Sequence, residues 1–130
     1  MCPTHPSSTT QDCGAALDQL HDRLLDMAVR ALALPPEQFT AAFTQLVANI
    51  ELDFRFEEQL MERFDCADAH LHREQHARML AGLHHAAATL EQGDPLPAQR
   101  ALSALREWLP FHIDTQDRHL LRAWQRTANT

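Results

Sequence analysis

The sequence lacks the residues on which several common chemistries depend. Lysine and tyrosine are absent, and only three glycines occur in 130 residues, so no glycine-rich phosphate loop is present. The formal net charge is −7 and no local basic patch is present, which argues against a nucleic-acid partner. Three cysteines form no C-x-x-C pair, and we expect incidental thiols rather than a disulfide framework.

Long hydrophobic runs are also absent. No apolar run reaches the roughly 18 residues of a membrane span, and no basic amphipathic face is present, so we expect no membrane partner. The first residues have neither the basic nor the apolar region of a secretory signal, and we therefore expect a cytoplasmic protein. A hydrophobic content of 45% with 22% charged residues is typical of one folded domain.

Apolar residues recur at helical spacing in four segments, and no segment alternates as a strand does. Short connections make neighbouring helices antiparallel, so we predict an all-α, up-down-up-down four-helix bundle over residues 13–130. Residues 1–12, rich in Ser, Thr and Pro, are predicted to be a flexible tail, and a monomer is the default expectation. The four segments lie at about 15–34, 37–64, 67–92 and 98–126.

Proline interrupts the fourth segment. Pro110 cannot donate a hydrogen bond to the carbonyl oxygen of Arg106, and its ring crowds the preceding turn. We therefore predict a kink in the fourth helix at this position.

Histidine is abundant, with nine in the chain, and several lie beside carboxylates on the apolar faces of the predicted helices. Residues four apart on a helix point the same way, about 5–6 Å from each other, and face the core of a bundle. Imidazoles and carboxylates without thiolates suit iron, manganese or zinc, and two bridging carboxylates suit a pair of metals. The candidate ligands are His21, Asp53, Glu57, His72, His76, His112 and Asp117.

Each candidate has a simpler explanation when taken alone. One H-x-x-x-H pair is nearly expected by chance among nine histidines, a lone carboxylate usually lies on a solvated face, and His21 fits a core imidazole. Together, however, these inward polar groups would each cost about 1–3 kcal/mol if they were unsatisfied. A metal pair satisfies all of them, so the conjunction favours a metal site.

The same residues resemble the hemerythrin family over about residues 18–117. The family's H-F-x-x-E-E-x-x-M signature is matched by Asp53-Phe54-x-x-Glu57-Glu58-x-x-Met61, except at its first position. His72 follows Glu57 by fifteen residues, and His76 lies one turn later. The other matching motifs are Leu17-Asp18-x-x-His21 and Trp108-Leu109-x-x-His112-Ile113, followed by Asp117.

This resemblance implies two iron ions in an oxo- or hydroxo-bridged di-iron centre that binds O2 at one iron. It implies that His72, His76 and His112 hold the filled iron. His21 and position 53 would hold the open iron, with Glu57 and Asp117 as bridges. It also implies an apolar wall around O2, made of Phe54, Trp108, Leu109 and Ile113.

Position 53 departs from the family, which has histidine there. If Asp53 is a direct ligand, its negative charge favours the ferric state, and oxidation in air should be faster. If Asp53 is too short to reach the iron, a water fills the position and leaves that iron open to O2, peroxide or nitric oxide. A third alternative is a salt bridge from Asp53 to Arg55 or Arg30.

Three functions remain open from the sequence. The first is an O2-binding carrier, store or sensor without turnover. The second is a di-iron redox enzyme, acting as an oxidase, a peroxidase or a nitric-oxide-reactive protein, which the extra carboxylate favours. The third is a metal-free or zinc-bound bundle used for interaction, and whether the chain is an enzyme stays open.

Overall fold

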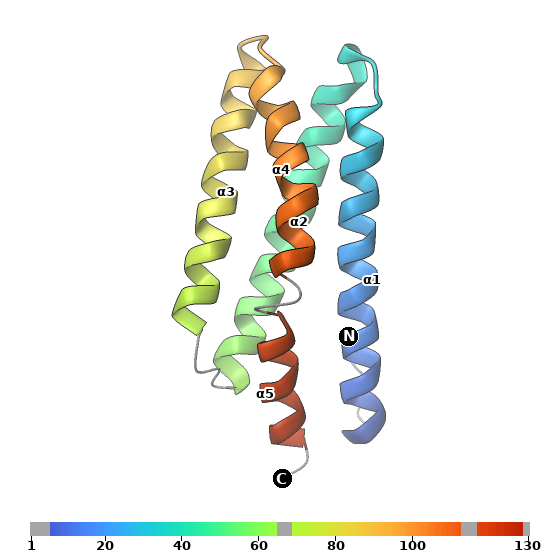
Figure 1. The fold of residues 1–130 in the computed structure, drawn as a ribbon, viewed down its shortest axis with the longest axis vertical. Helices are drawn as coiled ribbons and strands as arrows, with labels where there is room; N and C mark the ends of the chain where they lie inside the picture. The colour runs from blue at the N-terminus through green and yellow to red at the C-terminus, as the bar shows by residue number, and fades with distance from the viewer. Residues whose placement is uncertain (1–5, 65–68, 113–116, 129–130) are drawn as a thin grey trace.

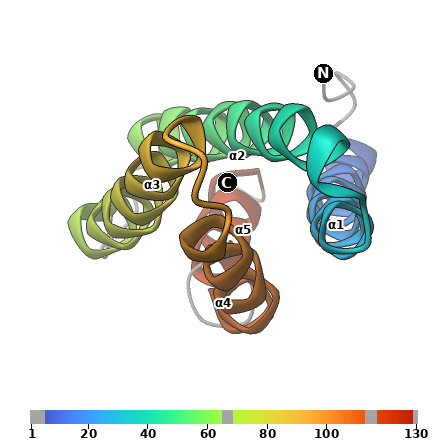
Figure 2. The same cartoon turned by 90° about the horizontal axis from the view of Figure 1, so that it is seen from above.

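The structure, a computed structural model, describes residues 6–64, 69–112 and 117–128. Four long helices run up, down, up and down, and each packs against the next (Figure 1). The fourth also packs against the first, which closes the bundle (Figure 2). The predicted all-α antiparallel bundle is confirmed. The helices are α1 (Pro6–Leu32), α2 (Pro36–Phe64), α3 (Ala69–Glu91), α4 (Leu96–His112) and α5 (Arg118–Ala128).

The predicted fourth helix is two helices in the structure. α4 ends at His112, two residues after Pro110, and α5 begins at Arg118 below it (Figure 1). Proline removes one backbone hydrogen bond and crowds the preceding turn, so a helix of this length is readily broken near it. α5 packs against α1 and α2, and it extends the bundle at the end opposite the α1–α2 connection.

The first helix starts earlier than the apolar periodicity does. α1 begins at Pro6, although residues 6–12 belong to the segment that was expected to be a flexible tail. Proline is well accommodated in the first turn of a helix, where its missing N–H has no intrahelical partner to lose. Apolar periodicity indicates only the turns of a helix that bury one face, so it does not predict where a helix begins if its first turns bury none.

A short turn at Gly93 and Asp94 ends α3 and leads into α4. Gly93 adopts a φ of +92°, which glycine tolerates, and its N–H donates to the carbonyl of Leu90 at 3.0 Å. The N–H of Asp94 donates to the carbonyl of Thr89 at 3.0 Å, and this pair of bonds is a Schellman ending. The Asp94 carboxylate then accepts a hydrogen bond from the N–H of Leu96 at the start of α4.

A layer of polar residues divides the hydrophobic core. On α2, Ile50 and Phe54 belong to the large cluster on one side of this layer, whereas Leu60 and Met61 belong to a small cluster on the other. α1 to α4 all contribute to the large cluster, and Leu120 of α5 completes the small one. The two clusters close the polar layer off along the bundle axis.

None of the described helices combines the length and hydrophobicity that a bilayer span requires. Of the residues that the sequence singles out, Ile113 lies outside the described ranges, as do Cys2 and Cys66.

Candidate metal centre

Seven polar side chains lie buried in this layer, none of them more than 3% exposed. One of these side chains comes from α1, two from α2, two from α3 and one from α4, and the seventh residue stands directly before α5. The structure therefore brings all seven candidate ligands together, where the sequence could only place each on its own helix. They are His21, Asp53, Glu57, His72, His76, His112 and Asp117.

Three imidazoles converge in one half of the layer. The Nε2 atom of His112 lies 3.1 Å from Nε2 of His72 and 3.1 Å from Nε2 of His76. At most one nitrogen of such a pair can donate to the other, so some nitrogen lone pairs point into a shared space. Glu57 Oε1 completes this group, 3.8 Å from His112 Nε2 and 3.7 Å from His76 Nε2.

The Asp117 carboxylate faces both halves of the layer. Its Oδ1 lies 3.1 Å from Nε2 of His72 and 3.1 Å from Nε2 of His112. Its Oδ2 lies 3.3 Å from Nε2 of His21. One oxygen toward each half is the arrangement that a bridging carboxylate needs.

His21 and Asp53 form the other half. The His21 Nε2–H donates to Asp53 Oδ2 at 3.1 Å, and Glu57 Oε1 lies 3.8 Å from the same nitrogen. Asp53 therefore faces the candidate centre and does not pair with the two arginines considered from the sequence. Arg30 instead pairs with Asp26 at 2.9 Å, and Arg55 is exposed.

The ligand atoms divide into two groups, each within 4.8 Å, and both groups include Glu57. One group holds Glu57 with His72, His76 and His112, and the other holds Glu57 with His21 and Asp53. Both oxygens of Glu57 and of Asp117, with Oδ1 of Asp53, are buried and accept no hydrogen bond from the described residues. Buried carboxylate charge costs several kcal/mol unless nearby positive charge compensates it, so this donor set fits cations held within the two groups.

Without a metal, the imidazoles act as counter-ions to these carboxylates. Burial by itself lowers the pKa of His21, but nearby Asp53 and Glu57 outweigh it and raise the pKa to about 10. Burial likewise lowers the pKa of His112, and Asp117 and Glu57 raise it to about 9. The metal-free centre therefore holds protons where a metal would place positive charge.

The two carboxylates of α2 respond differently to this environment. Burial raises the pKa of Asp53 to about 6, although its hydrogen bond to His21 opposes the rise. Burial would also raise the pKa of Glu57, but the three imidazoles around it, of His112, His21 and His76, hold the pKa well below its usual value. Of the two, Glu57 is therefore the carboxylate that loses its proton more readily.

Two outer residues orient the candidate ligand imidazoles, and the sequence did not assign them this role. The Nδ1–H of His76 donates to Glu58 Oε2 at 2.9 Å, and the Nδ1–H of His112 donates to Gln75 Oε1 at 3.3 Å. Each bond holds the Nδ1 proton on the outer side of the ring, so that Nε2 would be the nitrogen offered to a metal in the centre. Glu58 stands in the quoted α2 motif, so its position was visible, whereas Gln75 had no sequence signal.

Aromatic rings cover the imidazole side of the layer. Phe54 stacks on His76 with ring centroids 3.8 Å apart, and Trp108 stacks on His112 at 4.4 Å. Phe54 and Trp108 also contact each other edge to face at 5.9 Å. Leu109 is buried in the large core cluster, so three of the four predicted wall residues lie in the described structure beside this layer.

A four-helix bundle with a buried layer of imidazoles and carboxylates defines a hemerythrin-like protein with a candidate metal site. The chain is 27% identical over 110 residues to the bacteriohemerythrin of Ralstonia nicotianae (strain ATCC BAA-1114 / GMI1000). That match covers 85% of this chain and 80% of the other protein. The chain is thus a homologue of a bacteriohemerythrin, and the resemblance seen in its motifs is confirmed. No family model matches the sequence, and no solved structure matches it.

Proposed function

We propose that this layer holds two iron ions and that the protein binds O2 there as a carrier, store or sensor. The observation that carries the proposal is the pair of candidate ligand groups that share Glu57, with buried carboxylate oxygens that accept no hydrogen bond from the described residues. When bound, a ferrous pair supplies the site for O2 and the electrons that O2 takes up. The similarity to a bacteriohemerythrin supports iron as the metal.

The chain's own residues give the two halves different properties. His72, His76 and His112 offer three neutral donors to one metal, whereas His21 and Asp53 offer one neutral and one anionic donor to the other. In both halves Glu57 and Asp117 add shared negative charge. The aromatic rings of Phe54 and Trp108 cover the imidazole side, and an apolar cover of this kind strengthens the electrostatic interactions beneath it.

A second function is favoured by the position of Asp53. Its carboxylate is buried, faces His21 and is not neutralised by an arginine among the described residues. A negative charge there stabilises the higher oxidation state of a metal nearby. This observation favours a redox enzyme that consumes O2, peroxide or nitric oxide with an electron donor.

The visible absorption spectrum of the iron-loaded, reduced protein tests the proposal. Air is admitted and then removed under inert gas while the spectrum is recorded. O2 binding predicts a band that appears with air and disappears when the air is removed. Direct passage to a stable ferric spectrum would instead support the redox enzyme, to be assayed with peroxide and nitric oxide. A chain that takes up no iron would refute both functions.

Metal binding should release protons at neutral pH, because metal ligands must be deprotonated. His21, with a pKa of about 10, and His112, with a pKa of about 9, are both protonated at pH 7 in the metal-free chain. The affinity should therefore fall as the pH is lowered, and more steeply below about pH 6, where Asp53 is also protonated. Anaerobic titration with Fe²⁺ or Zn²⁺ in weak buffer measures the protons released.

The stability of the metal-free fold depends on pH in the opposite direction from the metal affinity. The raised pKa of His21 stabilises the folded chain below about pH 6.5, and this contribution is lost as the pH rises through about 10. Metal loading should abolish this loss of stability at high pH, as thermal unfolding of both forms can show. Metal uptake without proton release would contradict the assignment of His21 and His112.

Replacing Glu58 with glutamine should weaken metal binding without removing a ligand. Glu58 accepts a hydrogen bond from His76 Nδ1 at 2.9 Å and is about one-third exposed. Loss of such an outer partner typically costs 10- to 100-fold in metal affinity, and the partial exposure of Glu58 places the expected loss at about tenfold. Competition with a chelator measures it, and the partly exposed Glu51, which lies near His84 and not beside His76, serves as the control on the same helix when changed to glutamine. Equal affinities for the two variants would show that the bond to His76 is dispensable.

A further inference from the structure

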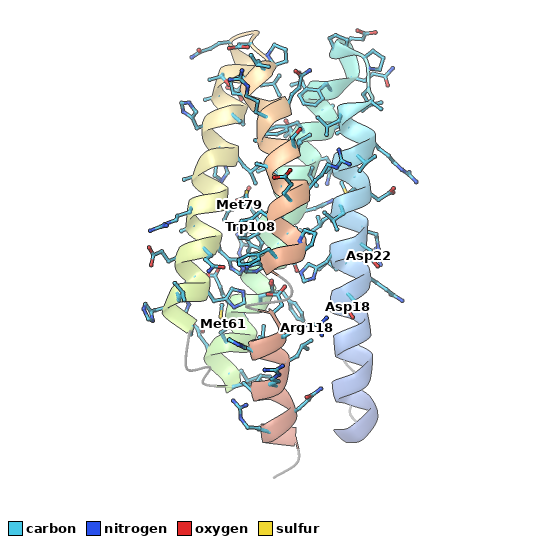
Figure 3. All side chains as sticks on the ribbon, viewed as in Figure 1. Asp18, Asp22, Met61, Met79, Trp108 and Arg118 are labelled. Atoms are coloured by element: carbon cyan, nitrogen blue, oxygen red, sulfur yellow. The ribbon has the colours of Figure 1, made fainter. Side chains whose placement is uncertain are left out.

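A groove of about 660 Å³ lies between α3 and α4, outside the candidate metal centre. Its size falls in the range of small-molecule sites, roughly 300–1,000 Å³. Figure 3 shows Met79 and Trp108, both of which line it, between these two helices. The groove passes along the outside of the bundle, so it does not share the closed polar layer.

Small residues make this groove. Gly82 on α3 and Ala104 on α4 both line it, where larger side chains would fill the space between the helices. A Cβ atom at Gly82 would meet no atom within 4 Å. Most of the other lining residues are apolar, including Met79 and Phe111, and Phe111 is 64% exposed. An apolar surface of this kind is available to a ligand.

The charge of the groove is opposite to that of the chain. The chain carries a formal charge of −7, yet Arg78, His85 and Arg100 line the groove, and none of its described lining residues is acidic. Arg78 already pairs with Glu74 at 2.6 Å on its own helix. Arg100 forms no ion pair with a carboxylate of the described chain, so it is the cation that remains for an anionic ligand.

The spacing of Arg100 and Trp108 indicates the length of that ligand. The two residues lie eight positions apart on α4, which is about 12 Å along the helix axis. An extended chain of about eight carbons with a terminal carboxylate spans a similar length. Trp108 stacks on the imidazole of His112 in the candidate metal centre. Gln75, which also lines the groove, accepts a hydrogen bond from Nδ1–H of His112. The far end of such a ligand therefore touches the residues that hold His112.

We propose that the groove between α3 and α4 binds a small amphipathic carboxylate, such as a medium-chain fatty acid. Its carboxylate lies at Arg100, and its apolar chain runs along the groove to Trp108. This binding site is separate from the candidate metal centre, and two of its described lining residues, Trp108 and Gln75, contact His112 of that centre.

Octanoate and octan-1-ol, which share an apolar chain and differ in charge, test the proposal. Calorimetry with the full chain, both metal-free and iron-loaded, should show one octanoate bound per molecule, about two- to fivefold more tightly than the alcohol. The Trp124→Phe chain leaves Trp108 as the fluorescent reporter, and its emission should change with octanoate over the same concentrations.

Two variants locate the site. Gly82→Leu fills the groove and should abolish binding of both ligands, while its better helix propensity maintains the fold. Arg100→Gln should weaken octanoate by about two- to fivefold and leave the alcohol unchanged. Arg106→Gln, an exposed arginine of α4 that does not line the groove, is the matched control.

The outcomes separate this proposal from the function of the metal centre. Equal affinity for octanoate and the alcohol, or an unchanged affinity in Arg100→Gln, would overturn the carboxylate assignment. Octanoate binding that survives Gly82→Leu, or the absence of any saturable binding, would overturn the site itself. Failure of the chain to take up iron would refute the di-iron proposal but leave the metal-free octanoate titration fully interpretable.

Discussion

A chain with glutamine at position 57 should hold at most one iron, whereas the parent chain should hold two. Glu57 belongs to both ligand groups, and its Oε1 lies within 3.8 Å of imidazole nitrogens from each half of the layer. Glutamine keeps the size of the side chain but loses its charge and one oxygen donor. Loss of an outer partner already costs up to about 100-fold in metal affinity, and loss of a shared ligand should lower the affinity for the second iron at least as much. Elemental analysis after anaerobic loading and desalting measures the iron content.

The matched control for this variant lies on the same helix. Glu62 is 73% exposed and pairs with Arg73, so Glu62→Gln changes the net charge by the same amount without touching the polar layer. It should bind two irons. A Glu57→Gln chain that also retains two irons, with an unchanged visible spectrum, would rule out Glu57 as the shared ligand.

Histidine at position 53 should slow the oxidation of the reduced iron protein in air by roughly 100-fold. Asp53 is buried against His21, so its negative charge would lie close to a metal held by the same group. Two unit charges about 4 Å apart interact by roughly 4 kcal/mol at an effective dielectric constant of about 20. Even two-thirds of that energy corresponds to about 100-fold in rate if it is felt in the oxidation step. A spectrophotometric time course of ferric formation after admission of air measures the rate.

A second variant separates the charge of Asp53 from its role as a ligand. Asp53→Asn removes the charge and preserves the volume, so it should slow oxidation if charge is the cause. Asp53→His also supplies an imidazole, so it should in addition lengthen the lifetime in air of the visible band that disappears when air is removed. If all three chains oxidise at the same rate, position 53 has no part in setting the chemistry of the open half.

The helices of this bundle were largely predictable because each buries one face. Apolar residues at helical spacing in all four segments, with Pro35-Pro36 and Gly93 between them, located the chain reversals. The break after α4 was predicted only as a kink. Pro110 identifies where the hydrogen-bond ladder is weakened, but the contacts that α5 makes with α1 and α2 determine where the chain goes next.

The candidate ligands were predictable one helix at a time. Spacings of four residues place Asp53 beside Glu57 and His72 beside His76 on any regular helix. Gln75 could not be found in this way, because its value lies in a 3.3 Å contact with His112 on another helix. No residue spacing within α3 predicts a contact with a residue of α4.

By itself, the sequence determined the helical class, the inward faces of the helices and the residue types that those faces carry. Only the tertiary structure decided that Asp53 faces His21 rather than an arginine, and that the two oxygens of Asp117 face opposite halves of the layer. It also decided that small residues leave a groove between α3 and α4. The physical reason is that helical spacing is a local property of the backbone, with about 3.6 residues per turn. Distances between helices depend instead on the height and rotation of each helix, which the packing of the whole core determines.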